Sequence, residues 1–211
     1  MQIEIVFGLV VLIVSVILHE VAHGYVADML GDPTARLMGR LTLNPLPHID
    51  PIGSIILPLF LGLTGSPILI GYAKPVPYNP DNLPGRYDET LVAFAGPGTN
   101  ICIALIFGLT IRFGAVAMSA PMLSAFAAIV YINMLLALFN LIPIPPFDGS
   151  KVLSGILPSG LSQTYAMFRS NFERIGLLPG MLLILIIFYA LSPFFTAALS
   201  WLFSLLTGVA V

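Results

Sequence analysis

Two histidines and a glutamate stand near the start of the chain, in the order His19-Glu20-Val-Ala-His23. The run before them, residues 5–18, is almost wholly apolar and predicts a helix that continues through the motif. Residues four apart on a helix lie on one face, so His19 and His23 can direct their ring nitrogens at one metal ion. Zinc accepts this arrangement, and Glu20 would lie beside the metal, where it can take a proton from water.

A structural interpretation of the same five residues is two core histidines and a glutamate that reaches toward water. The apolar surroundings argue against it, because a charged group at bilayer depth costs on the order of 3 kcal/mol or more. Three ionisable groups within five positions therefore need a partner, and a metal ion supplies one.

Composition indicates a polytopic membrane protein: of 211 residues, 58% are hydrophobic and only 9% charged, and the mean hydropathy is +1.01. The net charge of −2 gives no electrostatic footprint for nucleic acid, which we exclude as a partner. The single cysteine, Cys102, permits neither a disulfide framework nor a cysteine-rich zinc site, so a metal must use histidine and carboxylate. The N-terminal run lacks a basic start and a cleavage site, and we expect a retained helix rather than a removed signal peptide.

The apolar runs predict an all-α polytopic membrane protein with about four to six transmembrane helices and a small interfacial β element. Residues 150–175 read as a polar cytoplasmic connection with one interfacial helix, and residues 176–211 as two short spans or as one kinked span followed by an interfacial helix. The three clearest spans are Ile3–Met29, Glu89–Phe113 and Met122–Leu141.

The β element would come from Ala35–Leu43, which alternates imperfectly, and from Ile68–Tyr78, which is rich in β-forming residues and broken by prolines. The segment between them, Pro51–Leu63, is apolar but short, and a re-entrant or surface-lying piece is as consistent with it as a crossing.

A hydrolytic zinc needs a third protein ligand and an open position. Asp148 is preferred, because three prolines break the chain just before it, and irregular backbone at membrane depth is tolerated only where it lines a cavity or is buried in protein. Other candidates lie close to the first helix and its exit loop, where capping roles account for them: Asp28, Asp32, His48 and Asp50.

Gly96-Pro97-Gly-Thr-Asn100, inside the second clear span, permits two interpretations of equal weight. Its small residues can let another helix approach and its proline can kink the span. Alternatively, the kink and the Asn100 amide face the metal site.

Basic residues orient the first helix. No lysine or arginine precedes it, whereas Arg36 and Arg40 follow it, so its C-terminal end is expected in the cytoplasm. His19 lies roughly 24 Å along the helix, past the middle of a ~30 Å hydrocarbon core. We therefore expect an integral membrane protein, of a prokaryotic cell membrane, with its active site towards the cytoplasmic side.

Taken together, His19-Glu20-x-x-His23, the Gly96-Pro97-x-x-Asn100 element and Asn140-x-x-Pro-x-Pro-x-x-Asp148-Gly resemble the motifs of the site-2 protease family of intramembrane zinc metalloproteases, in its compact bacterial and archaeal branch. The likeness covers most of the chain up to about residue 157. It implies one zinc ion held by His19, His23 and Asp148, with Glu20 as catalytic base. It also implies that Asn140 helps to hold the substrate or the developing oxyanion.

The resemblance further implies peptide-bond hydrolysis within or near transmembrane segments of membrane-protein substrates, in a lipid bilayer. It divides the chain into a catalytic membrane core, residues 1–157, and a C-terminal part, residues 158–211, with the cytoplasmic connection and the last apolar helices. An edge strand near Ile68–Tyr78 could hold an unwound substrate. Substrate identity and oligomeric state do not follow from the sequence.

Two rival functions use the same polar groups. A metal-ion transporter would also carry intramembrane histidine and aspartate, but its task does not require Glu20 beside the first histidine, and the chain has no internal repeat. A catalytically silent membrane scaffold would not need all four groups.

Overall fold

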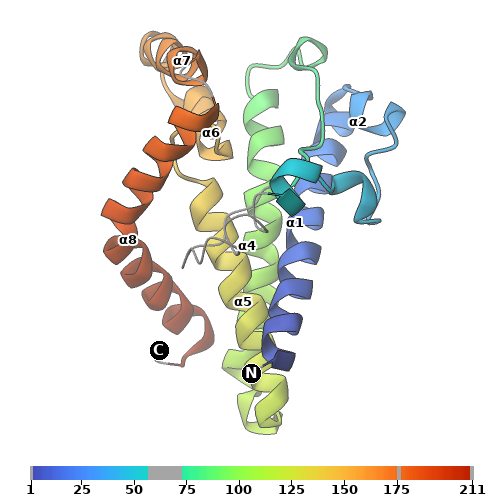
Figure 1. Cartoon of the computed structure of the whole chain (residues 1–211), viewed down its shortest axis with the longest axis vertical. Helices are drawn as coiled ribbons and strands as arrows, with labels where there is room; N and C mark the ends of the chain where they lie inside the picture. Colours follow the sequence, from blue (N-terminus) through green and yellow to red (C-terminus); the bar gives the residue numbers. More distant parts are fainter. Residues whose placement is uncertain (1, 57–72, 175–176, 210–211) are drawn as a thin grey trace.

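Four long helices lie side by side in the computed structural model, which describes residues 2–56, 73–174 and 177–209 (Figure 1). Each includes a stretch that is long and apolar enough to cross a membrane. The described part of this membrane protein contains no strand and is all-α. The long helices are α1 (Gln2–Leu30), α4 (Asp88–Gly114), α5 (Ala120–Asn140) and α8 (Leu177–Thr207).

The long helices alternate in direction. α1 runs towards the end of the molecule that carries the short helices, α4 returns, α5 runs forward again and α8 returns (Figure 1). The turn between α4 and α5 is tight and contains a single 3-10 turn, Ala115–Ala117. α4 contacts α1, α5 and α8, so it forms the centre of the bundle.

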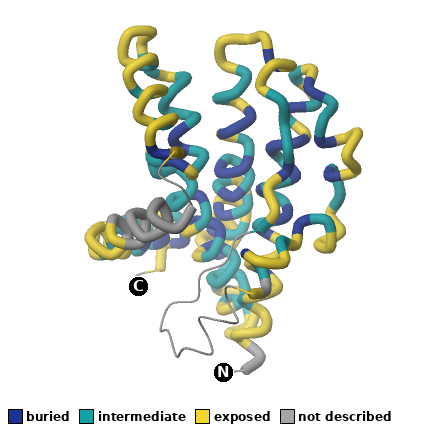
Figure 2. Tube along the Cα trace, turned by 45° about the horizontal axis from the view of Figure 1, so that its top comes forward, coloured by how far each residue is buried: buried dark blue, intermediate teal, exposed yellow. Residues whose placement is uncertain are grey.

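The helices divide their side chains between lipid and core. The first half of α1 is largely exposed although it is apolar, as expected for a lipid-facing surface. Buried residues line the inner faces (Figure 2). One cluster joins α4, α5 and α8 through residues such as Ile111, Val130 and Phe203.

α1 ends where the sequence predicts. Gly31 has φ of 112°, a conformation that a side chain disfavours, and Pro33 cannot continue the helix. Next come four short elements among the described residues: α2 (Thr34–Leu37), η1 (Leu46–His48), η2 (Pro51–Ile56) and η3 (Pro80–Asn82).

The predicted strand at Ala35–Leu43 is wrong. Its first residues form α2, Gly39 turns the chain with φ of 65°, and the rest is irregular. The local cause is the turn at Gly39, which interrupts any period-two pattern. Of Ile68–Tyr78, residues 73–78 are irregular without a strand partner, and residues 68–72 lie outside the described part. Residues 57–63 also lie outside the described part. The two alternatives for Pro51–Leu63, a membrane crossing or a re-entrant or surface-lying piece, therefore both stay open as predictions.

Asp32 ties the exit of α1 to the segment that leads into α4. Its side chain is fully buried and accepts hydrogen bonds from the Asn79 main-chain N–H at 2.6 Å and from the Asn82 amide at 2.8 Å. Burial acts to raise the pKa of Asp32, but the hydrogen bonds from Asn82, Thr34 and Asn79 outweigh it and hold that pKa below its ordinary value. Asp32 is thus a structural clamp rather than a metal ligand.

Two helices occupy the stretch where one interfacial helix was predicted. α6 (Asp148–Ile156) begins at the aspartate itself, and α7 (Ser159–Arg174) follows after a short break. α6 packs tightly on the start of α4. The contact is so close that a Cβ on Gly155 would overlap the Thr90 hydroxyl. Beyond α7, the last apolar stretch is a single helix, α8, with Pro193 inside it.

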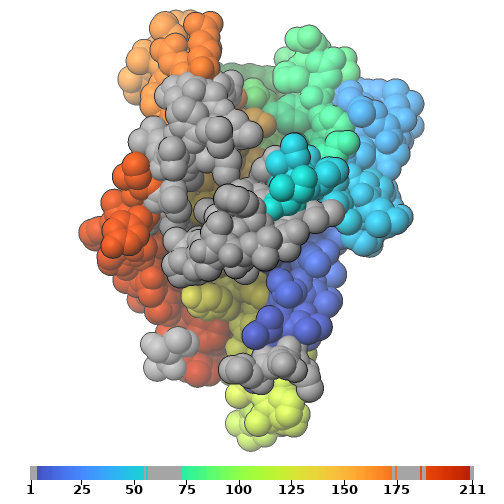
Figure 3. All heavy atoms as spheres, in the orientation of Figure 1, coloured from blue at the N-terminus to red at the C-terminus, as the bar shows by residue number. Residues whose placement is uncertain are grey.

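The two ends of the molecule differ in their number of basic residues. α7 and the loop at 79–86 form one end, and the α4–α5 turn forms the other (Figure 3). Of the eight basic residues, Arg112, in the last turn of α4, lies near the α4–α5 turn. The other seven belong to segments gathered around α2, α6, α7 and the start of α4: Arg36, Arg40, Lys74, Arg86, Lys151, Arg169 and Arg174.

Candidate active site

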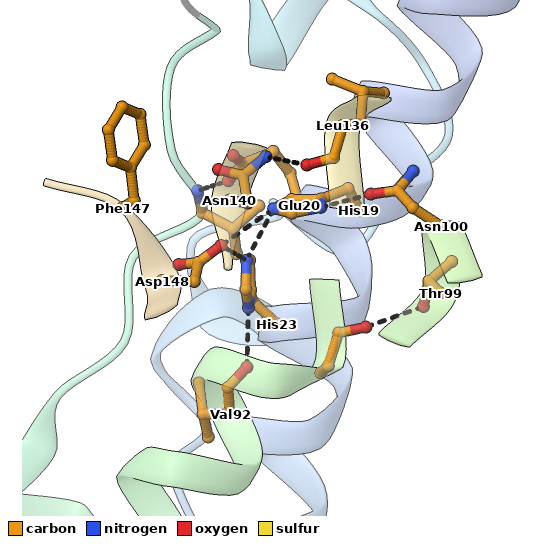
Figure 4. A network of polar contacts seen from close by, with 12 residues as sticks. His19, Glu20, His23, Val92, Thr99, Asn100, Leu136, Asn140, Phe147 and Asp148 are labelled. Carbon is orange, nitrogen blue, oxygen red and sulfur yellow. Dashed lines mark hydrogen bonds and ion pairs between the residues drawn. The ribbon is translucent and has the colours of Figure 1, made fainter. Parts of the chain in front are cut away.

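His19 and His23 of α1 meet Asp148 of α6 at one point (Figure 4). The two histidine Nε2 atoms are 3.1 Å apart, and the Asp148 Oδ2 atom lies 3.1 Å from His19 Nε2 and 3.3 Å from His23 Nε2. Both histidines are buried. The structure therefore brings the two histidines together with Asp148, which follows His19 by 129 positions in the sequence.

The other nitrogen of each ring faces a hydrogen-bond acceptor. His23 Nδ1 lies 2.7 Å from the main-chain carbonyl of Val92, and His19 Nδ1 lies 2.6 Å from Oδ1 of Asn100. A carbonyl oxygen can only accept, so each Nδ1 carries the proton and each Nε2 of the neutral ring presents a lone pair. Two lone pairs and a carboxylate oxygen then face one another.

This donor set fits a zinc ion. Ligand atoms about 2.0–2.2 Å from zinc at tetrahedral angles are roughly 3.4 Å from one another, close to the 3.1–3.3 Å separations among the three atoms. Two imidazoles and one carboxylate are also the ligand types of hydrolytic zinc sites. With three ligands from the chain, a tetrahedral zinc keeps one position for water or substrate.

Gly96 of α4 gives the two rings their space. A Cβ at this position would overlap Nε2 of both His19 and His23, so only glycine lets the α4 backbone come this close. The small residue thus permits the helix approach, which occurs at the site, and the Asn100 side chain faces His19. A kink at Pro97 stays a prediction.

The break between α5 and α6 positions Asp148. The prolines between these helices end α5 at Asn140, and the chain turns so that α6 starts with Asp148 facing α1. The Tyr165 hydroxyl of α7 donates to the Pro143 carbonyl at 2.8 Å. A Cβ on Gly149 would overlap the Leu141 carbonyl, which explains the glycine after the aspartate.

Glu20 is half-buried next to the histidines, and its Oε2 accepts a hydrogen bond of 2.9 Å from the main-chain N–H of Val76. Val76 belongs to the segment at 73–78, which follows the exit loop of α1. The sequence did not single out Val76, since a main-chain donor leaves no trace in residue type.

Arg40 and His48 hold this segment. Arg40 donates to the carbonyls of Lys74 and Pro75 at 2.8 and 3.1 Å, and the Lys74 N–H donates to the His48 carbonyl at 2.9 Å. The His48 ring itself lies 2.9 Å from the Thr42 carbonyl. His48 is therefore built into the loop and away from the three converging residues.

The other rejected candidates also have structural partners. Asp28 pairs with Arg36 at 2.9 Å, and Asp50 accepts from two main-chain N–H groups in its own turn, those of Ile52 and Gly53. Asp28 therefore takes part in an ion pair near the end of α1, and Asp50 stabilises its own turn.

Asn140 stands at the last position of α5. Its side-chain amide donates to the Leu136 carbonyl at 2.9 Å, one turn earlier in the same helix. This hydrogen bond directs the amide nitrogen, and the role of Asn140 towards a substrate stays a prediction.

Two further buried residues, Ser15 and Asn133, are linked to the site through Asn100. The sequence analysis did not single them out as functional. Their signal was weak but present, because a polar side chain inside an apolar span needs a partner.

Known proteins place the chain in a family. A model described as peptidase family M50 matches residues 109–187. The "Putative zinc metalloprotease YwhC" of Bacillus subtilis is 40% identical over 162 residues, which cover 72% of this chain and 69% of that protein. The chain belongs to peptidase family M50, the site-2 proteases. It is therefore a zinc-dependent metalloprotease embedded in the membrane, as its motifs suggested.

More distant relatives agree. The "Putative zinc metalloprotease Rip2" of Mycobacterium tuberculosis is 29% identical over 92% of this chain and 71% of its own length. The "Zinc metalloprotease MJ0392" of Methanocaldococcus jannaschii is 25% identical over 87% of this chain and 42% of its own length. No solved structure matches the chain significantly. The family match begins after α1, so it includes Asp148 but not the two histidines.

Zinc content tests the ligand set. Purified protein should carry about one zinc per chain, and His23→Ala and Asp148→Ala should each lose most of it, because two remaining ligands hold zinc weakly. Metal analysis after dialysis measures this. His48→Gln is the matched control and should keep its zinc, since His48 lies in the loop. Full zinc retention in both ligand variants would refute the assignment.

Gly96→Ala tests the close approach of α4. The added methyl group would overlap both imidazoles, so zinc affinity should fall by roughly ten- to hundredfold, the range seen when groups that orient metal ligands are disturbed. Gly98→Ala, two residues along the same helix, meets only the Phe94 ring, at 3.3 Å or more, and should bind zinc like the wild type. A chelator competition measures both, and equal affinities would show that the space at Gly96 is not needed.

Proposed function

We propose that this site-2 protease hydrolyses peptide bonds within or near the transmembrane segments of other membrane proteins, with zinc held by His19, His23 and Asp148 and with Glu20 as base. One observation carries the residue assignment: two imidazole lone pairs and a carboxylate oxygen converge next to Glu20 in the membrane-spanning part of the molecule. Neither the described residues nor the relatives favour the transporter or the scaffold.

Zinc bound there would supply a Lewis acid that lowers the pKa of water and polarises the carbonyl to be attacked. The chain's own residues do the rest. Asn100 and Val92 fix the two imidazoles, so the ligands need little rearrangement. Glu20 takes a proton from the attacking water and returns it to the amine that leaves.

Asn140 is the proposed substrate-binding residue. It ends α5 just before the break that leads to Asp148, so a peptide that reaches the site passes near the end of this helix. An asparagine amide can donate to a carbonyl oxygen or to the oxyanion that develops from it. The hydrogen bond to Leu136 uses one of its two N–H donors and leaves it a second.

A transmembrane substrate must unwind before cleavage, because its carbonyls are engaged in its own helix. Strand addition to 75–77 is disfavoured, since Pro75 and Pro77 lack an N–H and the N–H of Val76 is bonded to Glu20. The remaining residues of the predicted edge strand, 68–72, lie outside the described part.

The proposed orientation puts the end with α2, α6 and α7 in the cytoplasm. Seven of the eight basic residues belong to segments at that end, which agrees with the excess of lysine and arginine on cytoplasmic loops. The active site, near the last two turns of α1, would then lie towards the cytoplasmic side.

Residues 1–157 are proposed as the catalytic core and residues 158–211 as the part that braces it. The core contains every residue assigned to catalysis or to zinc. α7 contacts the core through the Tyr165 hydroxyl on Pro143 and through an ion pair of 3.5 Å between Arg169 and Glu89. These contacts support a bracing role for α7 on the loop before Asp148.

Glu20→Gln tests the proposed base. The amide keeps the size of the side chain but cannot take a proton from water, so cleavage should fall by about a hundred- to ten-thousandfold. Co-reconstitution with a transmembrane substrate measures cleavage, and metal analysis of the same samples should show normal zinc. Undiminished cleavage would remove Glu20 from the mechanism.

Cysteine labelling tests the orientation. In a Cys102→Ala background, Asp81→Cys should react with an impermeant reagent only from the cytoplasmic face, and Val116→Cys only from the outer face. Both positions are exposed, at opposite ends of the described bundle. Accessibility in intact cells and in inverted vesicles measures the two faces, and the reverse pattern would refute the orientation.

A further inference from the structure

A chain of buried amides leads away from His19 through all three helices that surround it. Nδ2 of Asn100 lies 2.9 Å from Oδ1 of Asn133, and Nδ2 of Asn133 lies 2.9 Å from the Ser15 hydroxyl. Asn100 and Asn133 are fully buried, and Ser15 is 3% exposed. These residues come from α4, α5 and α1 in turn, and none of them is a proposed zinc ligand.

The direction of the chain is set at its far end. One side-chain atom of Asn133 lies 2.9 Å from the main-chain carbonyl of Ile129. That carbonyl can only accept, so the atom facing it must be the amide nitrogen. The oxygen of Asn133 is then forced towards Asn100.

The same logic passes to the next residue. Because Asn133 presents an oxygen, the atom of Asn100 that faces it must be a nitrogen, which also lies 3.5 Å from the Ser15 carbonyl. The oxygen of Asn100 is left to face His19 Nδ1, at 2.6 Å. His19 Nδ1 must therefore hold its proton, and Nε2 must offer its lone pair.

We propose that Asn133 is a positioning residue that fixes the tautomer of His19, so that Nε2 faces the site as a ligand. His23 needs no such device, since the Val92 carbonyl faces its Nδ1 directly. An asparagine beside a histidine is ambiguous, because a reversed amide would donate to Nδ1 and move the ring proton to Nε2. Asn133 removes that ambiguity.

A purely structural role would be the joining of helices, for which buried asparagines are well suited in membranes. The two roles predict different results. If Asn133 only joins helices, the effect of a variant depends on how many hydrogen bonds it loses. If Asn133 sets the tautomer of His19, the effect depends only on whether an acceptor still faces Asn100.

The inference rests on the proposed zinc site, and the two can fail separately. If His23→Ala and Asp148→Ala both keep their zinc, the site is wrong. If His23→Ala loses its zinc but Asn133 variants bind it normally, the site stands and only the positioning role falls.

The first test leaves the buried amides and the proposed zinc ligands unchanged. Zinc-free protein labelled with 15N-histidine is studied by NMR at alkaline pH, about two units above the ordinary histidine pKa, with His48→Gln used to remove the signals of the third histidine in the chain. Both remaining rings should carry the proton on Nδ1. A proton on Nε2 of His19 would overturn the proposal.

The second test compares three variants by chelator competition for zinc and by thermal unfolding. Asn133→Leu removes the acceptor and should weaken zinc binding by roughly ten- to hundredfold, with the His19 proton moving to Nε2 while His23 is unchanged. Asn133→Asp keeps an oxygen towards Asn100 and should bind zinc more tightly than Asn133→Leu. Ser15→Ala leaves the Ile129 carbonyl to orient Asn133 and should keep wild-type zinc affinity.

Wild-type zinc affinity in Asn133→Leu, or equal losses in Asn133→Asp and Asn133→Leu, would overturn the proposal. If Asn133→Leu does not fold, two measurements decide the question. They are the tautomer of His19 in the protein with an unchanged Asn133, and the zinc affinity of Asn133→Asp compared with that of Ser15→Ala. An Asn133→Asp protein that folds but binds zinc poorly would then also overturn it.

Discussion

Three hydrogen-bond acceptors meet inside a membrane protein, and the arrangement around them follows from that constraint. Nε2 of His19, Nε2 of His23 and Oδ2 of Asp148 lie 3.1–3.3 Å apart with their lone pairs directed at one another. In a buried setting such a cluster is costly unless a cation neutralises it. One helix cannot build it alone, since the spacing of four supplies only the histidines. α4 must come close enough to hold both rings, and the chain after α5 must break to deliver the carboxylate.

The sequence could predict those parts of the site that depend on the types of residues close together in the chain. The spacing of His19 and His23 defines one helical face, and the prolines before Asp148 mark a broken segment with no ordinary use for a carboxylate. The predicted strand at Ala35–Leu43 failed because alternation over a few residues is a weak signal, which the turn at Gly39 overrides. The start of α6 was missed because polar residues after Asp148 resemble a connecting loop, although they form a helix packed on α4.

Longer-range relations could not be predicted, for physical reasons that differ from case to case. Asn133 is recognisable as a buried polar residue only once its neighbours from α1 and α4 are known. The donor that holds Glu20 is a main-chain N–H, which every residue but proline offers, so nothing marked Val76 in advance. The two interpretations of Gly96 could not be separated by sequence because they describe one contact, in which a missing side chain lets a helix approach and leaves room for the imidazoles.

The proposed metal ligands and the proposed base are held by different kinds of structure, and this division suits the tasks proposed for them. The histidines are fixed by helices of the membrane bundle, since zinc ligands must keep their positions throughout a catalytic cycle. As the proposed base, Glu20 would move a proton from water to the leaving amine, and it is held by one N–H from an irregular segment outside the bundle. Pro75 and Pro77 lack an N–H, so Val76 is the sole main-chain donor among residues 75–77. Lys151 of α6 lies 4.9 Å from the Tyr78 ring centre, which links this segment to the helix that carries Asp148. The segment that holds Glu20 is therefore tied through α6 to the residues proposed as zinc ligands.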